Sequence, residues 1–413
     1  MTTVSRHAVP GLLPQTATGT PTDLRTHHRL HGRLPDASGL VPVLREAGLT
    51  GHGGAGFPVH RKLSAVADAG HGTGRAPVAV ANGSEGEPAS LKDKTLLRLA
   101  PHLVLDGLRL AADAVGAGAR HLVVEAGSGL RPWLEAAVAE RGERVTVTEV
   151  PRRFLSGESS ALASHLSGRP ALPRFPDPPP RERGVGGAPT LVQNVETLAH
   201  IALIARYGAA WFQSLGTHQE PGTMLCTVHA GDVQPYVTEA PLGTPLHHLF
   251  GPVQHPVQAV LVGGYHGSWL PGPALGSRLA AADLGVPLGA GVLAALPATR
   301  CGLVETARVL RYLALESAGQ CGPCLNGLPR IASAFAELAD PSSAPHRPNL
   351  RADLARWSGL VAGRGACHHP DGTVRLVRSA LTVFAAEADT HQRGHCRATD
   401  TRPLLPVPGR RIG

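Results

Sequence analysis

Apolar and polar positions alternate in two different rhythms along the first half of the chain. Between residues 45 and 218, short β-type apolar runs alternate with longer stretches rich in Ala and Leu. The pattern predicts strands at 77–81, 121–125 and 144–150, and helices at 103–114 and 131–140. Strands that alternate with helices are typical of an α/β domain with a largely parallel sheet.

The rhythm changes twice more before the chain ends. Residues 219–291 predict a small β-rich module, and residues 292–390 follow the helical period and predict a helical bundle. The expected elements are strands at 223–228, 233–237 and 258–262, a turn with a short helix at 241–250, and helices at 304–316, 328–338, 350–361 and 374–387. Residues 1–44 form a polar arm, 391–413 a tail, and the segment 169–187, rich in Pro, Gly and Arg, a loop.

Composition narrows the classes of function. With 413 residues, 42% hydrophobic and 17% charged, the chain can fold into two to three globular domains. Its net charge is +8, but the basic residues are scattered and only 4% of residues are aromatic, which argues against a nucleic-acid interface. An anionic ligand or an acidic partner fits this charge equally well.

The chain shows no sign of export or of a membrane span. Residues 1–20 lack the apolar stretch of a secretory signal, and Gly, Pro and His interrupt the longest run without charged side chains, between Glu239 and Arg278. Six cysteines in a chain of this length do not suggest a disulfide framework. We therefore expect a cytoplasmic protein whose clustered cysteines serve metal or redox chemistry.

The first candidate site is the glycine-rich run from Gly51 to Pro58, which is followed by Lys62. Glycines let the backbone approach a ligand closely, and consecutive N–H groups can bind an anion. Lys62 is one of only three lysines in the chain, and the other two, Lys92 and Lys94, lie in the second motif. Phosphate binding and a simple turn explain the glycine run about equally well.

Three further polar motifs stand near expected strands and helices. The second motif, Asn82 to Pro88, follows the strand expected at 77–81, where an α/β sheet presents its ligand crevice. The third begins at Gly157 and Glu158, and the fourth at Gln193 and Asn194; each opens an amphipathic helix. A solvated loop explains the second equally well, and helix capping explains the other two.

The fifth motif is Cys321-Gly-Pro-Cys324, with Cys367 about forty residues later, followed by His368 and His369. This spacing fits a zinc site that a histidine completes, an iron–sulfur cluster, or a redox disulfide. The remaining cysteines have no cysteine or histidine pattern around them, so we expect ordinary buried or loop thiols at Cys226, Cys301 and Cys396.

Taken together and in this order, the five motifs resemble those of the flavin-carrying, NADH-oxidising subunit of respiratory complex I. The same family includes the flavin subunits of NAD-linked hydrogenases and formate dehydrogenases, and the resemblance spans about residues 45–385. It implies a Rossmann-like FMN-binding domain over 45–218, a β-grasp (SLBB-like) module over 219–291 and an iron–sulfur-binding helical domain over 292–390.

The resemblance also implies the residues of the sites. Gly51, Gly53 and Lys62 would hold the FMN phosphate and ribityl side, and Asn82, Glu85 and Glu87 would surround the flavin ring and the nicotinamide face. Glu87 is the catalytic candidate. The other cofactor-binding candidates are Gly54, Gly157, Glu158, Val192, Gln193, Asn194 and Thr197. Cys321, Cys324 and Cys367 would ligate an iron–sulfur cluster.

The chain departs from the family pattern at two places. Ala318 stands where the family has a fourth cluster cysteine, so three thiolates would hold a [3Fe–4S] cluster, or a [4Fe–4S] cluster with another fourth ligand. On the nicotinamide side, Ser84, Phe154 and Ser159 replace the usual Asp, Tyr and Glu, and no aromatic residue occurs at 178–181.

These departures indicate a divergent paralogue. We expect a flavoprotein oxidoreductase that passes electrons between NAD(P)H or a small redox protein and an iron–sulfur centre through FMN. Its partner would be a thioredoxin-like [2Fe–2S] protein or a ferredoxin. The alternatives are a scaffold that keeps the fold without turnover, and a zinc-stabilised ligand-binding protein.

Overall fold

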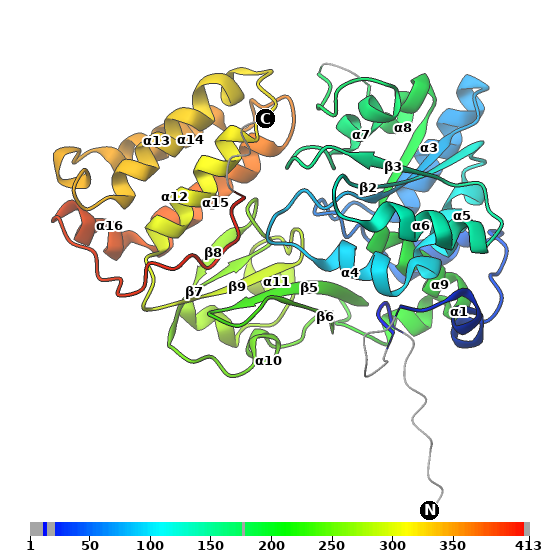
Figure 1. Ribbon diagram of the computed structural model, residues 1–413, viewed down its shortest axis with the longest axis horizontal. Helices are drawn as coiled ribbons and strands as arrows, with labels where there is room; N and C mark the ends of the chain where they lie inside the picture. The colour runs from blue at the N-terminus through cyan, green and yellow to red at the C-terminus, as the bar shows by residue number, and fades with distance from the viewer. Residues whose placement is uncertain (1–10, 15–20, 176–177, 409–413) are drawn as a thin grey trace, which may run out of the picture.

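A four-stranded parallel sheet forms the centre of the first domain in the computed structural model, which describes residues 11–14, 21–175 and 178–408 (Figure 1). The strands lie in the order β3-β2-β1-β4. Their bounds are β1 Val78–Gly83, β2 Ala119–Glu125, β3 Thr146–Val150 and β4 Thr190–Asn194. After β3 the chain returns to the other side of β1, so Asn82 and Asn194 stand in register where the strand order reverses. In α/β sheets, ligands bind at such a point.

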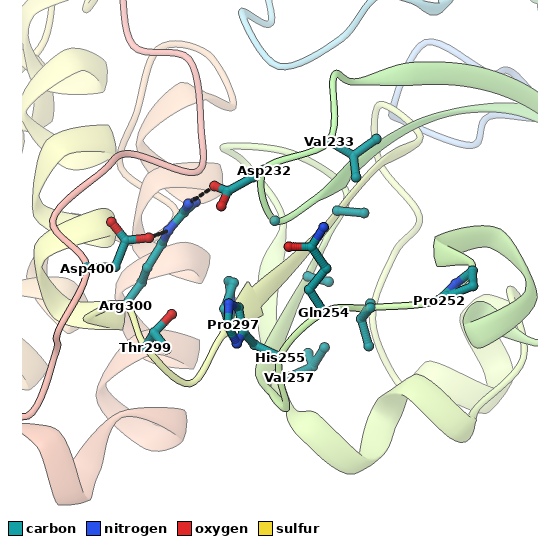
Figure 2. A pocket seen from close by; sticks show the side chains of 14 residues that line it. Asp232, Val233, Pro252, Gln254, His255, Val257, Pro297, Thr299, Arg300 and Asp400 are labelled. Atoms are coloured by element: carbon teal, nitrogen blue, oxygen red, sulfur yellow. Dashed lines mark hydrogen bonds and ion pairs between the residues drawn. The ribbon is translucent and has the colours of Figure 1, made fainter.

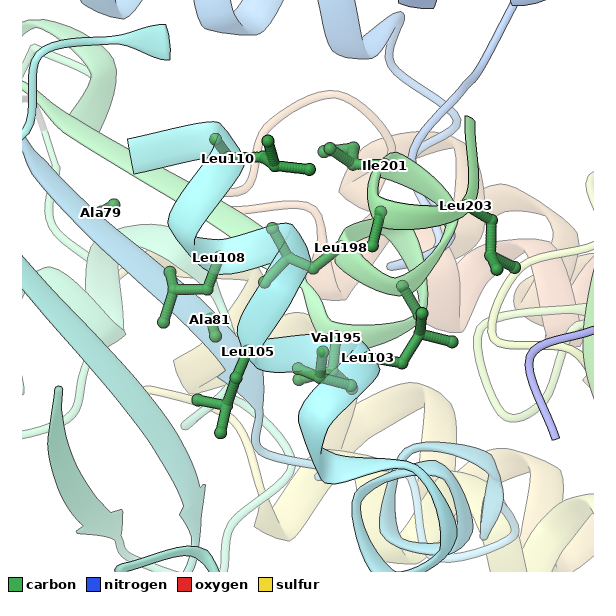
Figure 3. Packing of buried hydrophobic residues seen from close by; sticks show 14 of the residues in the cluster. Ala79, Ala81, Leu103, Leu105, Leu108, Leu110, Val195, Leu198, Ile201 and Leu203 are labelled. Atoms are coloured by element: carbon green, nitrogen blue, oxygen red, sulfur yellow. The ribbon is translucent and has the colours of Figure 1, made fainter. Parts of the chain in front are cut away.

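Helices cover both faces of this sheet, and one pair makes an unusually close contact. Helices α5 (Pro101–Ala114) and α9 (Val195–Gln213) pack their leucines together over one face (Figure 3). A Cβ on Gly107 would lie only 1.8 Å from the carbonyl oxygen of Leu198, so glycine permits this approach. The domain's remaining helices are α3 Val59–Thr73, α4 Lys92–Leu99, α6 Leu130–Glu140, α7 Ser159–Leu166, α8 Pro180–Arg183 and the short η1 Val185–Gly187.

The described part of the polar arm folds onto this domain. It contains α1 (Leu24–His31) and α2 (Leu40–Ala47), while residues 1–10 and 15–20 lie outside the described residues. His27 of α1 contacts the buried carboxylate of Asp106 at 2.7 Å. This contact, together with a hydrogen bond from Nε of Arg206 to the carbonyl oxygen of His31 at 3.0 Å, holds a helix that the polar composition did not predict.

The predicted β-rich module is a five-stranded mixed sheet in the order β6-β5-β9-β7-β8. Its elements are β5 Thr223–Ala230, β6 Tyr236–Pro241, α10 Leu246–Phe250, β7 Val257–Val262, β8 Ser268–Pro271, η2 Gly272–Gly276, α11 Ala281–Leu284 and β9 Val292–Pro297. The first and last strands, β5 and β9, pair in parallel, with β6 on the outer side of β5 and the β7–β8 hairpin on the outer side of β9, as in a β-grasp sheet. This sheet runs beyond residue 291, the expected boundary, because β9 supplies its middle strand.

The predicted helical bundle follows directly (Figure 1). Its helices are α12 Gly302–Leu315, α13 Leu328–Ala339, α14 Leu350–Val361, α15 His369–Val383 and α16 Ala385–Gln392, with the short turns η3 Pro323–Gly327 and η4 Ala344–His346. The helix expected at 374–387 is two helices, because the backbone leaves the helical conformation at Phe384. Of the described part of the chain, no helix is long and apolar enough to cross a membrane.

The tail, described to residue 408, ties the bundle to the β-rich module. Leu405 is buried, and its N–H donates to Glu305 of α12 at 2.7 Å. Arg300, between β9 and α12, reaches Asp232 of the module and Asp400 of the tail, the latter at 2.8 Å (Figure 2). The tail is therefore part of the folded structure.

Candidate functional site

The glycine-rich loop lies against the carboxyl end of β4. An isolated bridge between Thr50 and Pro58 closes the loop, and Gly54 and Gly56 adopt positive φ angles of 100° and 61°. A Cβ on Gly53 would lie 3.3 Å from Cβ of Asn194, so a larger residue would crowd that contact. The loop thus forms a shallow backbone cradle beside the point where the strand order reverses.

The loop is anchored by the first turn of α9. The N–H of His52 donates to Oγ1 of Thr197 at 2.9 Å. This contact joins the first and fourth motifs and brings Gly51, Gly53 and Thr197 into one region.

Lys62 reaches the same region from the first turn of α3. Its Nζ donates to the carbonyl oxygen of Val192 on β4 at 2.6 Å. An ammonium has three N–H donors, so this bond leaves capacity for a ligand. Burial, with a smaller contribution from Arg181, lowers the pKa of Lys62 to about 8.

The ends of β1 and of the loop before α7 meet next to this region. Nδ2 of Asn82 donates to the carbonyl oxygen of Gly157 at 2.9 Å, and a Cβ on Gly157 would lie 3.0 Å from the carbonyl oxygen of Ser84. Glu158 caps α7 by accepting from the N–H groups of Ser160 and Ala161 at 2.9 and 3.0 Å. The second and third motifs are therefore in contact.

The two glutamates of the second motif have different surroundings. Both carboxylate oxygens of Glu85 accept hydrogen bonds at the start of α4, from the N–H groups of Asp93 and Lys94 at 3.1 and 3.3 Å. Glu85 is thus a capping residue of α4 whatever else it binds.

Glu87 faces the β-rich module instead. Its Oε2 accepts from the N–H of Tyr265 at 3.0 Å, while Oε1 is buried with no partner among the described residues. Burial is the main cause that raises the pKa of Glu87 to about 8. A carboxyl group that keeps its proton at neutral pH can donate a hydrogen bond.

The end of β4 also holds an unsatisfied donor. Nε2 of Gln193 is buried without a hydrogen-bond partner among the described residues. Next to it, Asn194 caps α9 by accepting from the N–H of Glu196 at 3.0 Å and donates to Asp93 at 2.7 Å. Buried polar atoms are usually paired, so the free Gln193 amide suggests a ligand.

A buried ionic network beneath the glycine-rich loop was missed from the sequence. Lys92 lies 2.8 Å from Asp93 and 2.7 Å from Glu196, and Glu196 lies 3.0 Å from Nδ1 of His52. Burial opposes ionisation of Glu196, but Lys92 and His52 hold its pKa well below the usual range. His200 stacks on His52 with ring centroids 4.8 Å apart. The scarcity of lysine was the only sequence signal for this network.

The three candidate cluster cysteines lie at one end of the helical bundle. The Sγ atoms of Cys321 and Cys324 are 3.5 Å apart. Cys367 is close enough for its charge to interact with both and with Glu158 of the first domain. Partial burial raises the pKa of Cys321, but hydrogen bonds from the N–H groups of Ala366 and Cys324 outweigh this effect, so the pKa is lowered overall. Three cysteines gathered at one place are a ligand set that suits an iron–sulfur cluster.

The departures from the family pattern have clear positions. Ala318 lies in the half-buried turn before Cys321, where its methyl group cannot ligate, and His368 is fully exposed beside Cys367. Phe154 packs against His266 and His369, with ring centroids 4.7 and 5.5 Å apart. Phe154 therefore belongs to the contact between the first domain and the bundle.

One expectation about the cysteines is wrong. Cys226 is a buried thiol, as expected, and burial raises its pKa strongly. Cys301 and Cys396 are not isolated, because the fold places their sulfurs together with His391, with all three ligand atoms within 4.8 Å of one another. Ninety-five residues separate the two cysteines, so their spacing gives no recognisable motif.

Comparison with known proteins supports the assignment of the first domain and of the helical bundle. Residues 44–203 match the Nuo51 FMN-binding domain, and residues 305–391 match the NADH-ubiquinone oxidoreductase-F iron–sulfur binding region. The F 2 subunit of NADH-quinone oxidoreductase in Rhizobium meliloti (strain 1021) is 29% identical over 388 residues, covering 85% of this chain and 88% of that protein. The corresponding F subunit of Escherichia coli (strain K12) is 29% identical over 391 residues, covering 87% and 85%.

Among solved structures, the NAD+-reducing [NiFe]-hydrogenase in the H2-reduced state superposes with a TM-score of 0.78 at 30% identity. The match covers 91% of this chain but only 66% of that hydrogenase chain, so this protein spans about two thirds of its length. With both domain matches in the expected order, the chain belongs to the family of the flavin-binding F subunit of NADH-quinone oxidoreductase.

Proposed function

We propose that this chain is an FMN-dependent oxidoreductase that transfers electrons between a nicotinamide nucleotide and an iron–sulfur centre. The observation that carries the proposal is the meeting of the glycine-rich loop, Lys62 and the carboxyl ends of β1 and β4 at one point of the sheet. Family membership supports the same assignment.

The residues present fit FMN. The loop at Gly53 is a cradle that a side chain would crowd, and the buried Nε2 of Gln193 lacks a partner among the described residues. Lys62 and the N–H groups of Gly53 and Gly54 would hold the phosphate, since cationic and backbone donors favour an anion. Gly51 would shape the loop, because its N–H already donates to the carbonyl oxygen of Phe57 at 3.0 Å. The other proposed binding residues are Asn82, Glu85, Gly157, Glu158, Val192, Asn194 and Thr197.

Glu87 is the proposed catalytic residue. Its raised pKa lets it keep a proton at neutral pH, and Oε1 has no partner among the described residues, so it can donate to an acceptor at the ring or nicotinamide face. FMN, when bound, exchanges electrons in pairs with nicotinamide and singly with an iron–sulfur cluster.

The residues also fit an iron–sulfur cluster, with one ligand short of four. Cys321, Cys324 and Cys367 would hold it, and the interaction of Cys367 with Glu158 supports a short path from the flavin site. With Ala318 in place of a fourth cysteine, we propose either a [3Fe–4S] cluster or a [4Fe–4S] cluster completed from outside these three thiolates.

The similar proteins and the state of the cysteines bear on the redox partner and on the location of this protein. Subunits of multi-enzyme complexes are among the similar proteins, which supports a redox partner. We propose a thioredoxin-like [2Fe–2S] protein or a ferredoxin as that partner. All six cysteines are free, which supports a reducing, cytoplasmic location.

Ala318 supports a second candidate function, a scaffold that keeps the fold and has lost turnover. The two functions separate when FMN, iron and acid-labile sulfide are measured per chain after anaerobic purification. The oxidoreductase requires all three. The variant Cys324→Ser should lose iron and sulfide while keeping FMN, and Cys396→Ser should keep all three. Protein with zinc but no sulfide, or with neither flavin nor iron, would reject the oxidoreductase.

A further inference from the structure

Three metal-ligating side chains converge far from the proposed flavin and cluster sites. Cys301 lies at the N-terminus of α12, His391 near the end of α16, and Cys396 in the segment that follows α16. One ligand atom from each lies within 4.8 Å of the other two. Cys301 and His391 are buried, whereas Cys396 is exposed.

We propose that Cys301, His391 and Cys396 bind a single zinc ion. Sulfur and nitrogen ligands at about 2.3 and 2.0 Å from a tetrahedral zinc lie about 3.5 Å apart. The Sγ of Cys301 and Nε2 of His391 are 3.6 Å apart, which is this separation. Cys396 is exposed, so water can reach the fourth position.

The histidine is oriented as a metal ligand. Nδ1 of His391 lies 3.2 Å from the carbonyl oxygen of Leu338, which can only accept, so Nδ1 carries the proton and Nε2 presents its lone pair toward Cys301. Histidine ligands in metal sites are commonly fixed by a backbone carbonyl at the second nitrogen.

The charges around the group suit a divalent cation. Oε2 of Glu387 lies 3.5 Å from the sulfur of Cys301, and it already accepts from the N–H groups of Gly302 and Leu303. Two thiolates beside this carboxylate would repel one another, and a divalent ion offsets that repulsion. Two sulfurs with one imidazole form a ligand set that suits zinc.

The site would fasten the tail at a junction of two domains. Cys301 directly follows Arg300, and Cys396 precedes Asp400 by four residues; Arg300 and Asp400 form an ion pair (Figure 2). Zinc would therefore hold the tail to the start of α12 beside this ion pair. We expect a structural role for the zinc, because an ion that binds only the folded state of a protein stabilises that state.

The test is the zinc content of the full chain, measured by elemental mass spectrometry. The chain is produced without a metal-affinity tag in zinc-supplemented medium. We expect about one zinc per chain in the wild type. Cys396→Ser should lose zinc, with affinity lower by more than about 100-fold. His395→Asn, an exposed neighbour in the same segment, is the matched control and should keep it. Cys321→Ser should keep this zinc while losing iron.

Cobalt(II) provides a second measurement that does not depend on zinc retained during purification. Added to the metal-free chain in which Cys321→Ser and Cys324→Ser remove the cluster thiolates, it should give thiolate-to-metal absorption when Cys301, His391 and Cys396 are present and in His395→Asn, but not in Cys396→Ser. Zinc content that is unchanged in Cys396→Ser would overturn the proposal. A disulfide between Cys301 and Cys396 in the zinc-treated chain, or no cobalt–thiolate absorption when all three ligands are present, would overturn it equally.

Discussion

Lys62 is the proposed cationic ligand of the FMN phosphate, and burial lowers its pKa to about 8. Its Nζ donates to the carbonyl oxygen of Val192. A neutral amine cannot attract a phosphate as an ammonium does, so binding of an anion and protonation of Lys62 are linked. The same side chain therefore sets both the affinity and its pH dependence.

Substitution of Lys62 by Met should weaken FMN binding by about 10- to 100-fold, because a hydrogen bond to a charged group contributes about 1.5–3 kcal/mol. In the wild type, affinity should fall as the pH rises above 8, by up to about tenfold per pH unit, since the free protein then loses the ammonium. Flavin fluorescence titrations at several pH values measure both effects. Arg61→Met, which removes an exposed charge from the next position, should change affinity little.

Glu87 should have a measurable effect on stability. Its pKa is raised from 4.5 to about 8, so the folded state binds the proton more tightly than the unfolded state does. Its contribution is fully present below pH 4.5 and is lost as the pH rises through 8, with a slope of up to about 1.4 kcal/mol per pH unit. In Glu87→Gln, this loss is absent. Thermal unfolding should show that the stability of the variant, relative to that of the wild type, increases as the pH rises from 5 to 8. A stability difference that stays constant over this range would contradict the raised pKa of Glu87.

At the scale of elements, the contact between α5 and α9 depends on one glycine (Figure 3). In Gly107→Ala, the new methyl group would meet the backbone of Leu198 at 1.8 Å, so the two helices must separate. We expect a loss of about 3 kcal/mol in the free energy of unfolding.

The matched control is Gly72→Ala in α3, where a Cβ meets nothing within 4 Å. It should stabilise the protein by about 0.5–1 kcal/mol through helix propensity alone. Urea unfolding of the two variants measures the difference. Equal effects in both would mean that the close approach of α5 and α9 is incorrect.

Asp106 connects four helices through its carboxylate. It lies 2.7 Å from His27 of α1 and 2.6 Å from Arg141 after α6, and it pairs with Arg206 of α9. Asp106→Ala would leave two buried guanidinium groups without this partner, and we expect a loss of about 3–5 kcal/mol. Asp113→Ala, an exposed position on the same helix, should change stability by less than about 0.5 kcal/mol. Similar losses in both variants would contradict this account.

The strands and helices of the first domain were predictable because the spacing of their apolar residues matches the periods of a strand and of a helix. The strand expected at 77–81 is β1 (Val78–Gly83), and the helix expected at 131–140 is α6 (Leu130–Glu140). The expected bounds are wrong where a single residue interrupts the apolar pattern. The strand expected at 233–237 begins only at Tyr236, because Pro235 has no N–H for the ladder.

The candidate site was predictable only where its residues form short motifs. The glycine-rich loop, Lys62 and the Cys321–Cys324 pair are local patterns, and the fold brings the first two to the end of β4. The network of Lys92 with Glu196, and the meeting of Cys301 with Cys396, join residues about a hundred positions apart. Spacing carries no information about such contacts, which depend on tertiary structure.

At the scale of the whole molecule, the three parts meet around the candidate site (Figure 1). Glu87 of the first domain binds the backbone of Tyr265 in the β-rich module, and Phe154 packs on His369 of the bundle. Cys367 and Glu158 interact across the same contact. The proposed flavin and cluster sites therefore lie where the domains of one chain meet.

The most direct test of this account is an anaerobic spectroscopic titration of the freshly purified protein with NADH, and then with NADPH. The account predicts that the flavin absorption bleaches and that the broad absorption of the iron–sulfur cluster falls with it. In Cys324→Ser, the flavin should still bleach while the cluster absorption is absent. Flavin bands that stay oxidised with both nucleotides and bleach only with dithionite would contradict transfer of electrons from a nicotinamide nucleotide.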